Sequence, residues 1–586
     1  MKEKDYVANL KDQQTTTQFS AGIYTDAIAK ELDAWQHENK IQRLWDHDAT
    51  LWTNTDENKW MGWLNVISEK SEVSRIESLT NEIKTAGITD IVLLGMGGSS
   101  LCPAMMADTF GKIQDYPQLH ILDSTDPLQI RHLEKSINLK KTFFIVSSKS
   151  GSTLEPNIYK EYFYTRLQKI LNKEEVGDRF IAITDPGTTL ETIAIKDNFK
   201  AIFHGVPAIG GRYSALSNFG MVPSGLMGVN IQEFLRLAET MQQPCSSVVL
   251  VKNNPGAVLG VILGVCAKQG KDKVTLITSP GIHSLGAWLE QLLAESTGKN
   301  GKGLIPVDQE PLGDPSVYGT DRVFIYIRLQ SAVDTDQDRS VRELELAGCM
   351  VVRLSLPDKM HLGAELFRWE IATAVVGSIL GINPFNQPDV EESKVLSLQL
   401  TSQYEKTGSI TTPNPFFSEE GIMLFTDKNN EENISKLLVG DPNLEGYLQA
   451  HLSQVKQGDY VNLSAFIEMS DEHTALLQQI RILIRNNKKV ATCLGFGPRF
   501  LHSTGQAYKG GPNTGVFLQI TADHREDIQV PGHNYTFGLV IAAQAQADFT
   551  VLAQRSRRVL RIHLGKDVSH GLKQLRELIH RACNNS

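Results

Sequence analysis

The chain has 586 residues, a length that predicts three or four domains. Hydrophobic residues make up 41% and charged residues 21% of it, which is the composition of an ordinary globular protein. The formal net charge of −9 argues against nucleic acid or an anionic membrane surface as the main partner. A local basic pocket for a phosphate is compatible with that total.

Hydropathy and cysteine usage indicate a cytoplasmic protein. No uninterrupted apolar run approaches the roughly 20 residues of a membrane span, and the N-terminal residues lack the apolar core of a secretion signal. The 6 cysteines are scattered without CxxC pairs, as expected of reduced thiols rather than of disulfides or a zinc site. We therefore predict no membrane contact and no metal.

The first 70 residues are predicted to be an N-terminal helical segment. Residues 1 to about 20 are polar and predict a flexible stretch. From residue 21 to 68, apolar side chains such as Leu32, Trp35 and Leu44 recur at helix-like steps. The dense tryptophans that follow, which include Trp60 and Trp63, indicate packing rather than a binding site.

Residues 71–229 alternate between helix and strand and form the first predicted domain. A helix is expected at 76–86, and strands are expected at 90–94, 119–122, 142–146 and 179–183. Largely apolar strands separated by helices predict a parallel sheet with helices on both faces. In such sheets ligands gather at the carboxyl ends of the strands.

The motif IVSSKSGSTLEP at residues 145–156 lies at one of these strand ends. It reads as a buried strand, a turn and the start of a helix, with five hydroxyl side chains and Lys149 around Gly151. A helix N-terminus offers unpaired N–H groups and a positive dipole end to an anion. A single Ser or Thr here would be an ordinary N-cap, but five hydroxyls exceed what capping requires. We predict a phosphate cradle, although not a Walker loop, because the GxxxxGK[ST] spacing is absent.

The turn GMGGSS at residues 95–100 lies at a second strand end. A dinucleotide fingerprint would require a third glycine where the chain has Ser100, and Asp123 is the only candidate acidic partner. We therefore favour backbone amides that serve a sugar phosphate over an NAD site.

Residues 230–400 form the second predicted α/β domain. Helices are expected at 231–241, 255–269, 363–380 and 389–399, and a further helix opens after residues 279–281 and ends at about residue 296. Strands are expected at 273–278, 322–329 and 350–354. Gln291 and Glu295 are four apart and share one helix face. Glu295 ends its helix beside a glycine-rich loop, so it is a candidate general base rather than only a solvated charge. Arg212 follows two glycines, which allow the backbone to bring it towards a cleft. Lys394 lies on a helix, and a single lysine in a helix is by default a solvent-exposed charge.

The remaining chain is predicted to be a linker at 401–420 and a C-terminal α/β domain at 421–586. Strands are expected at 489–494, 515–521 and 558–564, and a helix at 538–555. The loop LHSTGQAYKGGPNTG places His502 among polar and glycine residues. For this histidine a structural and a catalytic role are equally supported.

Five motifs together resemble the phosphoglucose isomerases. The motif SKSGST resembles the phosphate-binding signature of sugar-isomerase (SIS) domains. Four other motifs occur with it, over residues 90–395, in the order found in that family: GMGGSS, GGRYS, AESTGK and NPFNQPDVEESK. The stretch RLWDHDATLW and the C-terminal unit resemble the isomerase half of bifunctional transaldolase/phosphoglucose isomerases. The segment before the first sheet is too short for the transaldolase barrel. The resemblance implies two SIS-type doubly wound parallel-sheet domains in a three-layer α/β/α arrangement, plus a C-terminal α/β unit.

The resemblance also implies a role for individual residues. Glu295 matches the base that moves a proton between C1 and C2 through a cis-enediol, and Arg212 matches the arginine that stabilises the enediolate. Lys394 matches the lysine that assists ring opening. No cofactor is implied, since a carbonyl already acidifies the neighbouring C–H bond and an arginine compensates the charge. The residues expected to bind the sugar and its phosphate are Gly98, Ser99, Ser148, Lys149, Ser150, Thr153, Gln291 and Gln387.

One departure from the family pattern concerns the ring-opening histidine. Short bacterial members carry it in an LHSLGQ-type stretch soon after the glutamate, where this chain has no histidine at residues 314–319. The matching LHSTGQ contains His502, which would have to reach the site from the C-terminal unit of the same subunit or a neighbour. His361 is the alternative.

We thus expect a glucose-6-phosphate isomerase that acts on a hexose 6-phosphate and forms a homodimer. One alternative is a dual phosphoglucose/phosphomannose isomerase, because a single side chain can decide whether the C2 epimer is accepted. A non-catalytic SIS sugar-phosphate sensor is another, although binding alone would not require Glu295, Arg212 and Lys394 together.

Overall fold

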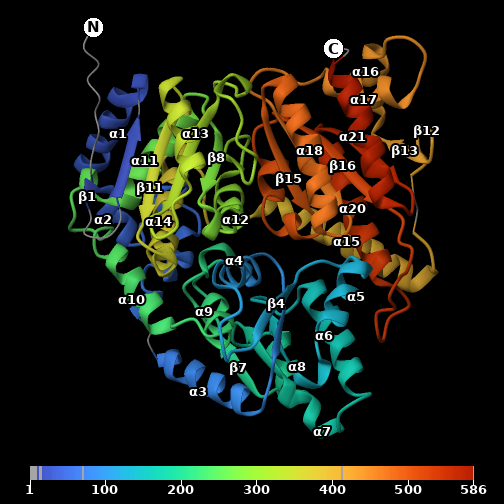
Figure 1. Ribbon diagram of the computed structural model, residues 1–586. Helices are drawn as coiled ribbons and strands as arrows, with labels where there is room; N and C mark the ends of the chain where they lie inside the picture. The colour runs from blue at the N-terminus through green and yellow to red at the C-terminus, as the bar shows by residue number, and fades with distance from the viewer. Residues whose placement is uncertain (1–9, 12–15, 21, 69–70, 411–412, 585–586) are drawn as a thin grey trace.

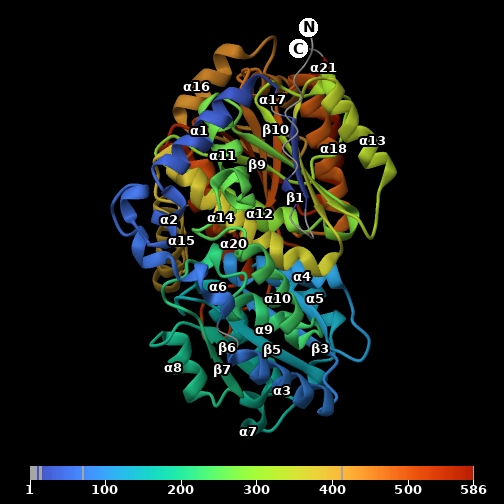
Figure 2. The same cartoon turned by 90° about the vertical axis from the view of Figure 1, so that its left-hand side faces the viewer.

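The computed structural model describes residues 10–11, 16–20, 22–68, 71–410 and 413–584. Three α/β units, each with its own sheet, make up the molecule (Figure 1). The first unit lies below the other two in both views (Figures 1 and 2). Parallel sheets flanked by helices confirm the predicted α/β class. Within the described residues, no helix is both long enough and apolar enough to cross a membrane.

The first sheet has the strand order β4-β3-β5-β6-β7, and all its pairs are parallel. Its strands are β3 (Asp90–Gly95), β4 (Gln118–Leu122), β5 (Thr142–Ser147), β6 (Phe180–Thr184) and β7 (Ala201–His204). Its helices are α3 (Ser71–Thr85), α4 (Leu101–Phe110), α5 (Pro127–Ser136), α6 (Leu154–Leu167), α7 (Lys173–Val176), α8 (Thr189–Lys196) and α9 (Asn218–Leu226). The four predicted strands are confirmed, and β7 is an edge strand that the sequence pattern missed.

The second sheet has the order β1-β2-β11-β10-β8-β9. Its parallel strands are β8 (Lys273–Thr278), β9 (Ile305–Val307), β10 (Arg322–Leu329) and β11 (Met350–Leu356). The helices that accompany it are α1 (Thr25–His37), α2 (Lys40–Trp45), α10 (Ile231–Gln242), α11 (Pro255–Lys268), α12 (Leu285–Thr297), α13 (Thr335–Leu346) and α14 (Leu362–Leu380).

The N-terminal stretch joins this second sheet. Strand β2 (Thr16–Ser20) pairs antiparallel with β11, and β1 (Leu10–Lys11) pairs with β2. The prediction of a flexible segment is therefore wrong for Thr16–Ser20, because their backbone groups pair with β11 and Phe19 is buried in the core. Residues 1–9 and 12–15 lie outside the described residues.

The third sheet has the order β12-β13-β17-β16-β14-β15, of which β14 to β17 are parallel. Its strands are β12 (Phe417–Glu419), β13 (Ile422–Phe425), β14 (Tyr460–Phe466), β15 (Ala491–Phe496), β16 (Gly515–Ala522) and β17 (Arg558–Leu564). The helices are α15 (Pro388–Thr407), α16 (Lys428–Leu437), α17 (Leu444–Leu452), α18 (Asp471–Lys488), α19 (Gly505–Gly510), α20 (Phe537–Gln554) and α21 (Val568–Asn584). Helix α15 continues past the predicted end at residue 399, so the first residues of the predicted linker 401–420 are helical.

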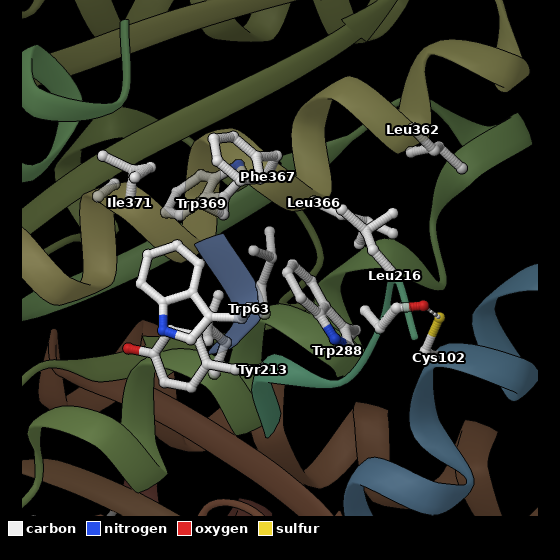
Figure 3. Close-up of a cluster of buried hydrophobic side chains, with 14 of the residues drawn as sticks. Trp63, Cys102, Tyr213, Leu216, Trp288, Leu362, Leu366, Phe367, Trp369 and Ile371 are labelled. Atoms are coloured by element: carbon white, nitrogen blue, oxygen red, sulfur yellow. Dashed lines mark hydrogen bonds between the residues drawn. The ribbon is translucent and has the colours of Figure 1, made fainter. Parts of the chain in front are cut away.

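The tryptophans near the N-terminus pack in the core, as predicted. Trp35 and Trp63 are fully buried, and the rings of Trp63 and Tyr213 lie 5.1 Å apart between their centroids (Figure 3). Helix α14 contributes Phe367 and Trp369 to the same cluster. This packing fixes Tyr213, and therefore holds in place the neighbouring Arg212, whose role follows.

Candidate active site

Two glycine-rich turns meet at the end of strand β3. The turn η6 (Gly97–Ser99) packs against η9 (Gly211–Tyr213), and a Cβ atom at Gly98 would lie 2.0 Å from the carbonyl oxygen of Gly211. A Cβ atom at Gly97, where φ is +56°, would lie 2.9 Å from the carbonyl oxygen of His502. Only glycine allows these three backbone segments to approach so closely. Gly98 and the buried Ser99 thus lie beside Arg212.

Arg212 is fixed by hydrogen bonds from every nitrogen of its guanidinium. It is only 2% exposed. Its Nε donates to Ser296 Oγ at 2.8 Å, and Nη1 donates to Gln387 Oε1 at 3.1 Å. Its Nη2 donates to the carbonyl oxygens of Pro384 and Asn386. A buried, fully bonded guanidinium is a fixed positive charge that does not need to reorganise during a reaction.

The carboxylate of Glu295 lies beside this charge. Its Oε1 is 3.3 Å from Arg212 Nη1, and its Oε2 accepts a hydrogen bond of 3.1 Å from Gln291 Nε2. Both side chains project from the last turns of α12, where the residues are almost entirely buried. The oxygen Oε1 of Gln291 is also buried but has no protein partner in the described chain, so it is available to a ligand. The predicted proximity of Glu295, Gln291 and Arg212 is thus present.

The hydroxyl-rich turn lies between β5 and α6. Ser148 Oγ donates to Thr153 Oγ1 at 3.3 Å, and Thr153 is the N-cap residue of α6 but makes no side-chain capping bond. Ser150 is exposed and accepts from the backbone and the side chain of Ser152. Lys149 forms an ion pair with Asp185, so its side chain is engaged away from the turn and only its backbone remains available there. Hydroxyl groups gathered at a helix N-terminus are suited to an anion.

His502 reaches this region from the C-terminal unit of the same chain. Its carbonyl oxygen accepts a hydrogen bond of 2.9 Å from Gln291 Nε2. Its Nε2 lies 3.0 Å from Oε1 of Glu155, a buried carboxylate in the first turn of α6. Burial raises the pKa of Glu155, but the charge and hydrogen bond of His502 outweigh that effect, with a further contribution from Lys394, and the pKa is lowered overall. Glu155 therefore favours the carboxylate form.

Sequence reasoning missed Glu155. It follows the SKSGST motif directly, but an acidic residue in the first turn of a helix is common because it complements the dipole. Nothing in the local pattern indicates that its partner is a histidine 347 positions further along the chain.

The other predicted residues lie at different distances from this centre. Gln387 contacts Arg212 directly. Lys394, on the second turn of α15, is partly exposed and pairs with Glu391 at 2.8 Å. His361 precedes α14 and lies 2.9 Å from Asp358, and in the described chain it has no hydrogen bond to the centre formed by Glu295 and Arg212. The structure thus brings His502, and not His361, to the candidate site.

Lys299 is a second residue that the sequence reading missed. It is 3% exposed, and its Nζ donates to the carbonyl oxygens of Glu295 and Ser296 at 2.9 and 2.7 Å. Burial and the charge of Arg212 lower its pKa well below the ordinary value, against the opposing charges of Glu295 and Asp389. An ammonium group that closes the last turn of α12 complements the negative end of that helix.

The arrangement is suited to proton transfer on an anionic ligand. It combines a carboxylate held between an arginine and an amide, a histidine paired with a second carboxylate, and a hydroxyl-rich helix N-terminus. In the described part of the chain, no cluster of three or more His, Cys, Asp or Glu side chains is arranged to hold a metal ion.

Comparisons with known proteins give one consistent result. A family model described as phosphoglucose isomerase matches residues 56–307, a range that contains Ser148, Arg212 and Glu295 but neither Lys394 nor His502. The glucose-6-phosphate isomerase of Parabacteroides distasonis is 26% identical over 404 residues, which are 60% of this chain and 89% of that protein. The corresponding protein of Prochlorococcus marinus (strain NATL2A) is 29% identical over 371 residues, 56% of this chain and 70% of that protein.

A solved structure shares the fold. The crystal structure of a glucose-6-phosphate isomerase from Chlamydia trachomatis superposes with a TM-score of 0.56 at 19% identity. The superposition covers 67% of this chain and 89% of that one.

Proposed function

We propose that this chain is a member of the phosphoglucose isomerase family and interconverts glucose 6-phosphate and fructose 6-phosphate. The observation that carries the proposal is the position of Glu295, whose carboxylate lies 3.3 Å from a buried arginine and 3.1 Å from a buried amide. A sensor that only binds sugar phosphates would have no use for a carboxylate held in this way.

Substrate binding is assigned to the turn between β5 and α6. The hydroxyls of Ser148, Ser150 and Thr153, together with backbone N–H groups at the start of α6, would hold the phosphate. Gly98 and Ser99 would line the sugar, and the free Oε1 of Gln291 would accept a bond from a sugar hydroxyl. Anchoring the phosphate fixes the distance between C1–C2 and the base, which converts the proton transfer into an intramolecular step.

Proton transfer is assigned to Glu295. Its carboxylate would take the proton from C2 of the open-chain aldose and return it to C1 of the cis-enediol, while a second proton passes from O2 to O1. The reverse reaction would exchange these roles. Negative charge develops on the enediolate oxygens during the transfer, and the guanidinium of Arg212 would stabilise it without moving.

Ring opening is assigned to His502, with Lys394 assisting. A ring-opening group has to exchange a proton with the ring oxygen, and the imidazole of His502 is placed for this by Glu155, which is bonded to its Nε2. His361 is not proposed for this step, because its Nδ1 pairs with Asp358 and it has no hydrogen bond to Glu295 or Arg212 in the described chain.

The decisive experiment is a Glu295→Gln variant in a coupled assay of fructose 6-phosphate conversion. We expect turnover to fall by about 10²–10⁴-fold, because the amide is of similar size but is not a base. Exchange of the C2 hydrogen with solvent deuterium should fall in parallel. The exposed Glu343→Gln is the matched control and should leave both rates unchanged. Normal turnover in the Glu295 variant would refute the proposal.

The same purified protein distinguishes the alternatives. Turnover of mannose 6-phosphate beside glucose 6-phosphate would favour the dual-specificity isomerase. Binding of either sugar phosphate without turnover would favour the sensor. A homodimer is expected from the family resemblance, and sedimentation equilibrium tests it.

A further inference from the structure

A glutamine from the C-terminal unit extends the pair formed by His502 and Glu155. Gln544 lies on α20 and is 3% exposed. Its Nε2 donates to Glu155 Oε1 at 2.6 Å, which is the same oxygen that lies 3.0 Å from His502 Nε2. Its Oε1 accepts a hydrogen bond of 2.7 Å from the hydroxyl of the buried Thr125. Four side chains, two from the first unit and two from the C-terminal unit, are thus linked in one row.

The chemistry of the row fixes the direction of each hydrogen bond. An ionised carboxylate can only accept, so the NH₂ group of Gln544 has to face Glu155 and its oxygen has to face the donor Thr125. For the same reason the imidazole has to present an N–H to Glu155 at Nε2. In a neutral imidazole the other nitrogen, Nδ1, is then an acceptor, and it has no hydrogen bond in the described chain.

The hydrogen bond that Gln544 donates also affects the charge of Glu155. This carboxylate is buried, and burial alone would favour its neutral form. Two hydrogen bonds to one oxygen favour the charged form instead. Gln544 supplies one of them from a neutral amide, so it stabilises the carboxylate without adding a charge.

We propose that Gln544, oriented by Thr125, is a positioning residue that holds Glu155 ionised and aimed. It thereby keeps His502 protonated at Nε2, with Nδ1 free to take the proton of the anomeric hydroxyl and pass it to the ring oxygen as the bond between the anomeric carbon and that oxygen breaks. The inference rests on the proposed isomerase function. It assigns to the C-terminal unit a second contribution to the site beside His502.

The test separates ring opening from proton transfer. The measurements use a Glu295→Gln background, which is expected not to isomerise the sugar. In this background the enzyme-catalysed interconversion of the α and β anomers of fructose 6-phosphate reports ring opening alone. NMR exchange spectroscopy measures its rate. We expect Gln544→Met, which keeps the side-chain length but no hydrogen bond, to lower this rate at least tenfold. Thr125→Val should lower it less, and the double variant should lose less than the product of the two effects. Gln554→Leu, on the exposed end of the same helix, is the control.

The outcomes are distinct from those that test the isomerase itself. If Glu295→Gln still isomerises, the proposed function fails. If it does not isomerise, but both Gln544→Met and Thr125→Val anomerise the sugar at the parent rate, only the positioning role is refuted. If Gln544→Met does not fold, Thr125→Val is the deciding variant, because it leaves the amide in place. A slower anomerisation rate with an unchanged unfolding temperature would then support the positioning role. An unchanged anomerisation rate would overturn it.

Discussion

The carbonyl oxygen of His502 accepts a hydrogen bond of 2.9 Å from the side chain of Gln291, and the same amide nitrogen lies 3.1 Å from Glu295. Gln291 and Glu295 belong to α12 of the second unit, whereas His502 belongs to the C-terminal unit. The C-terminal unit is therefore part of the candidate site. Its helix α19 packs against α12, and a Cβ atom at Gly298 would lie 2.3 Å from the Cα atom of Ala507.

The first prediction concerns His502→Asn. We expect turnover of the cyclic hexose phosphates to fall by about 10²–10⁴-fold, because the variant removes the group that exchanges a proton with the ring oxygen. Deuterium exchange at C2 of the small fraction of substrate that opens spontaneously should be retained, which a coupled assay and NMR measure together. His37→Asn, at an exposed position of α1, should leave both unchanged. Equal loss of ring opening and exchange would mean that His502 acts on the whole site and not on ring opening.

The second prediction concerns Gly98→Ala. The new Cβ atom would lie 2.0 Å from the carbonyl oxygen of Gly211, and a backbone atom cannot rotate away as a side chain can. We expect a loss of about 1–3 kcal/mol in the free energy of unfolding and a larger loss in kcat/KM, because the turn that carries Arg212 has to move. Gly565→Ala meets nothing within 4 Å and is the control for both measurements. An active, stable Gly98→Ala variant would mean that the two turns separate without cost.

The elements of the three sheets were largely predictable because their signals are local. Strands such as β5 and β10 are continuous apolar runs between turn residues, and such runs are typical of parallel strands that are buried on both faces. Strand β14 was missed because Asn462 and Ser464 interrupt its apolar pattern. Both are nevertheless buried, and they hydrogen-bond to one another.

The candidate site was predictable where its residues lie in one motif, and less so where the partners are distant in the sequence. Gln291 and Glu295 are one helical turn apart, so their shared face follows from periodicity. The partner of His502 is Glu155, and that of Glu155 is Gln544; each pair depends on how whole units dock. Lys299 belongs to the glycine-rich loop after Glu295, and nothing local indicates that its side chain folds back onto the helix it follows.

The third prediction concerns Lys299→Met. The variant keeps the buried aliphatic chain but removes the two hydrogen bonds to the last carbonyls of α12 and a positive charge beside Glu295. We expect kcat to fall about tenfold with little change in KM, because Lys299 is buried and its Nζ is bonded to the helix that carries Glu295. The exposed Lys268→Met, near the end of α11, is the matched control. An unchanged kcat would restrict Lys299 to a structural role.

The fourth prediction concerns His451, a fully buried histidine of the C-terminal unit. Its Nε2 lies 3.2 Å from the carbonyl oxygen of Phe517, and its Nδ1 lies 3.3 Å from Gln454 Nε2. Burial lowers its pKa from 6.5 to about 4, and the charge of Arg558 acts in the same direction. The folded protein therefore binds fewer protons than the unfolded chain between these two values.

The stability that this histidine supports should be complete above about pH 7 and should decrease as the pH falls through 6.5 towards 4. At pH 5 the loss is about 2 kcal/mol relative to pH 7.5. His451→Gln retains a donor and an acceptor but does not titrate, so its unfolding temperature should vary less between pH 7.5 and pH 5 than that of the parent protein. Differential scanning calorimetry at the two pH values measures this difference, with the exposed His37→Gln as the control. If both variants follow the pH dependence of the parent protein, His451 does not contribute to acid sensitivity.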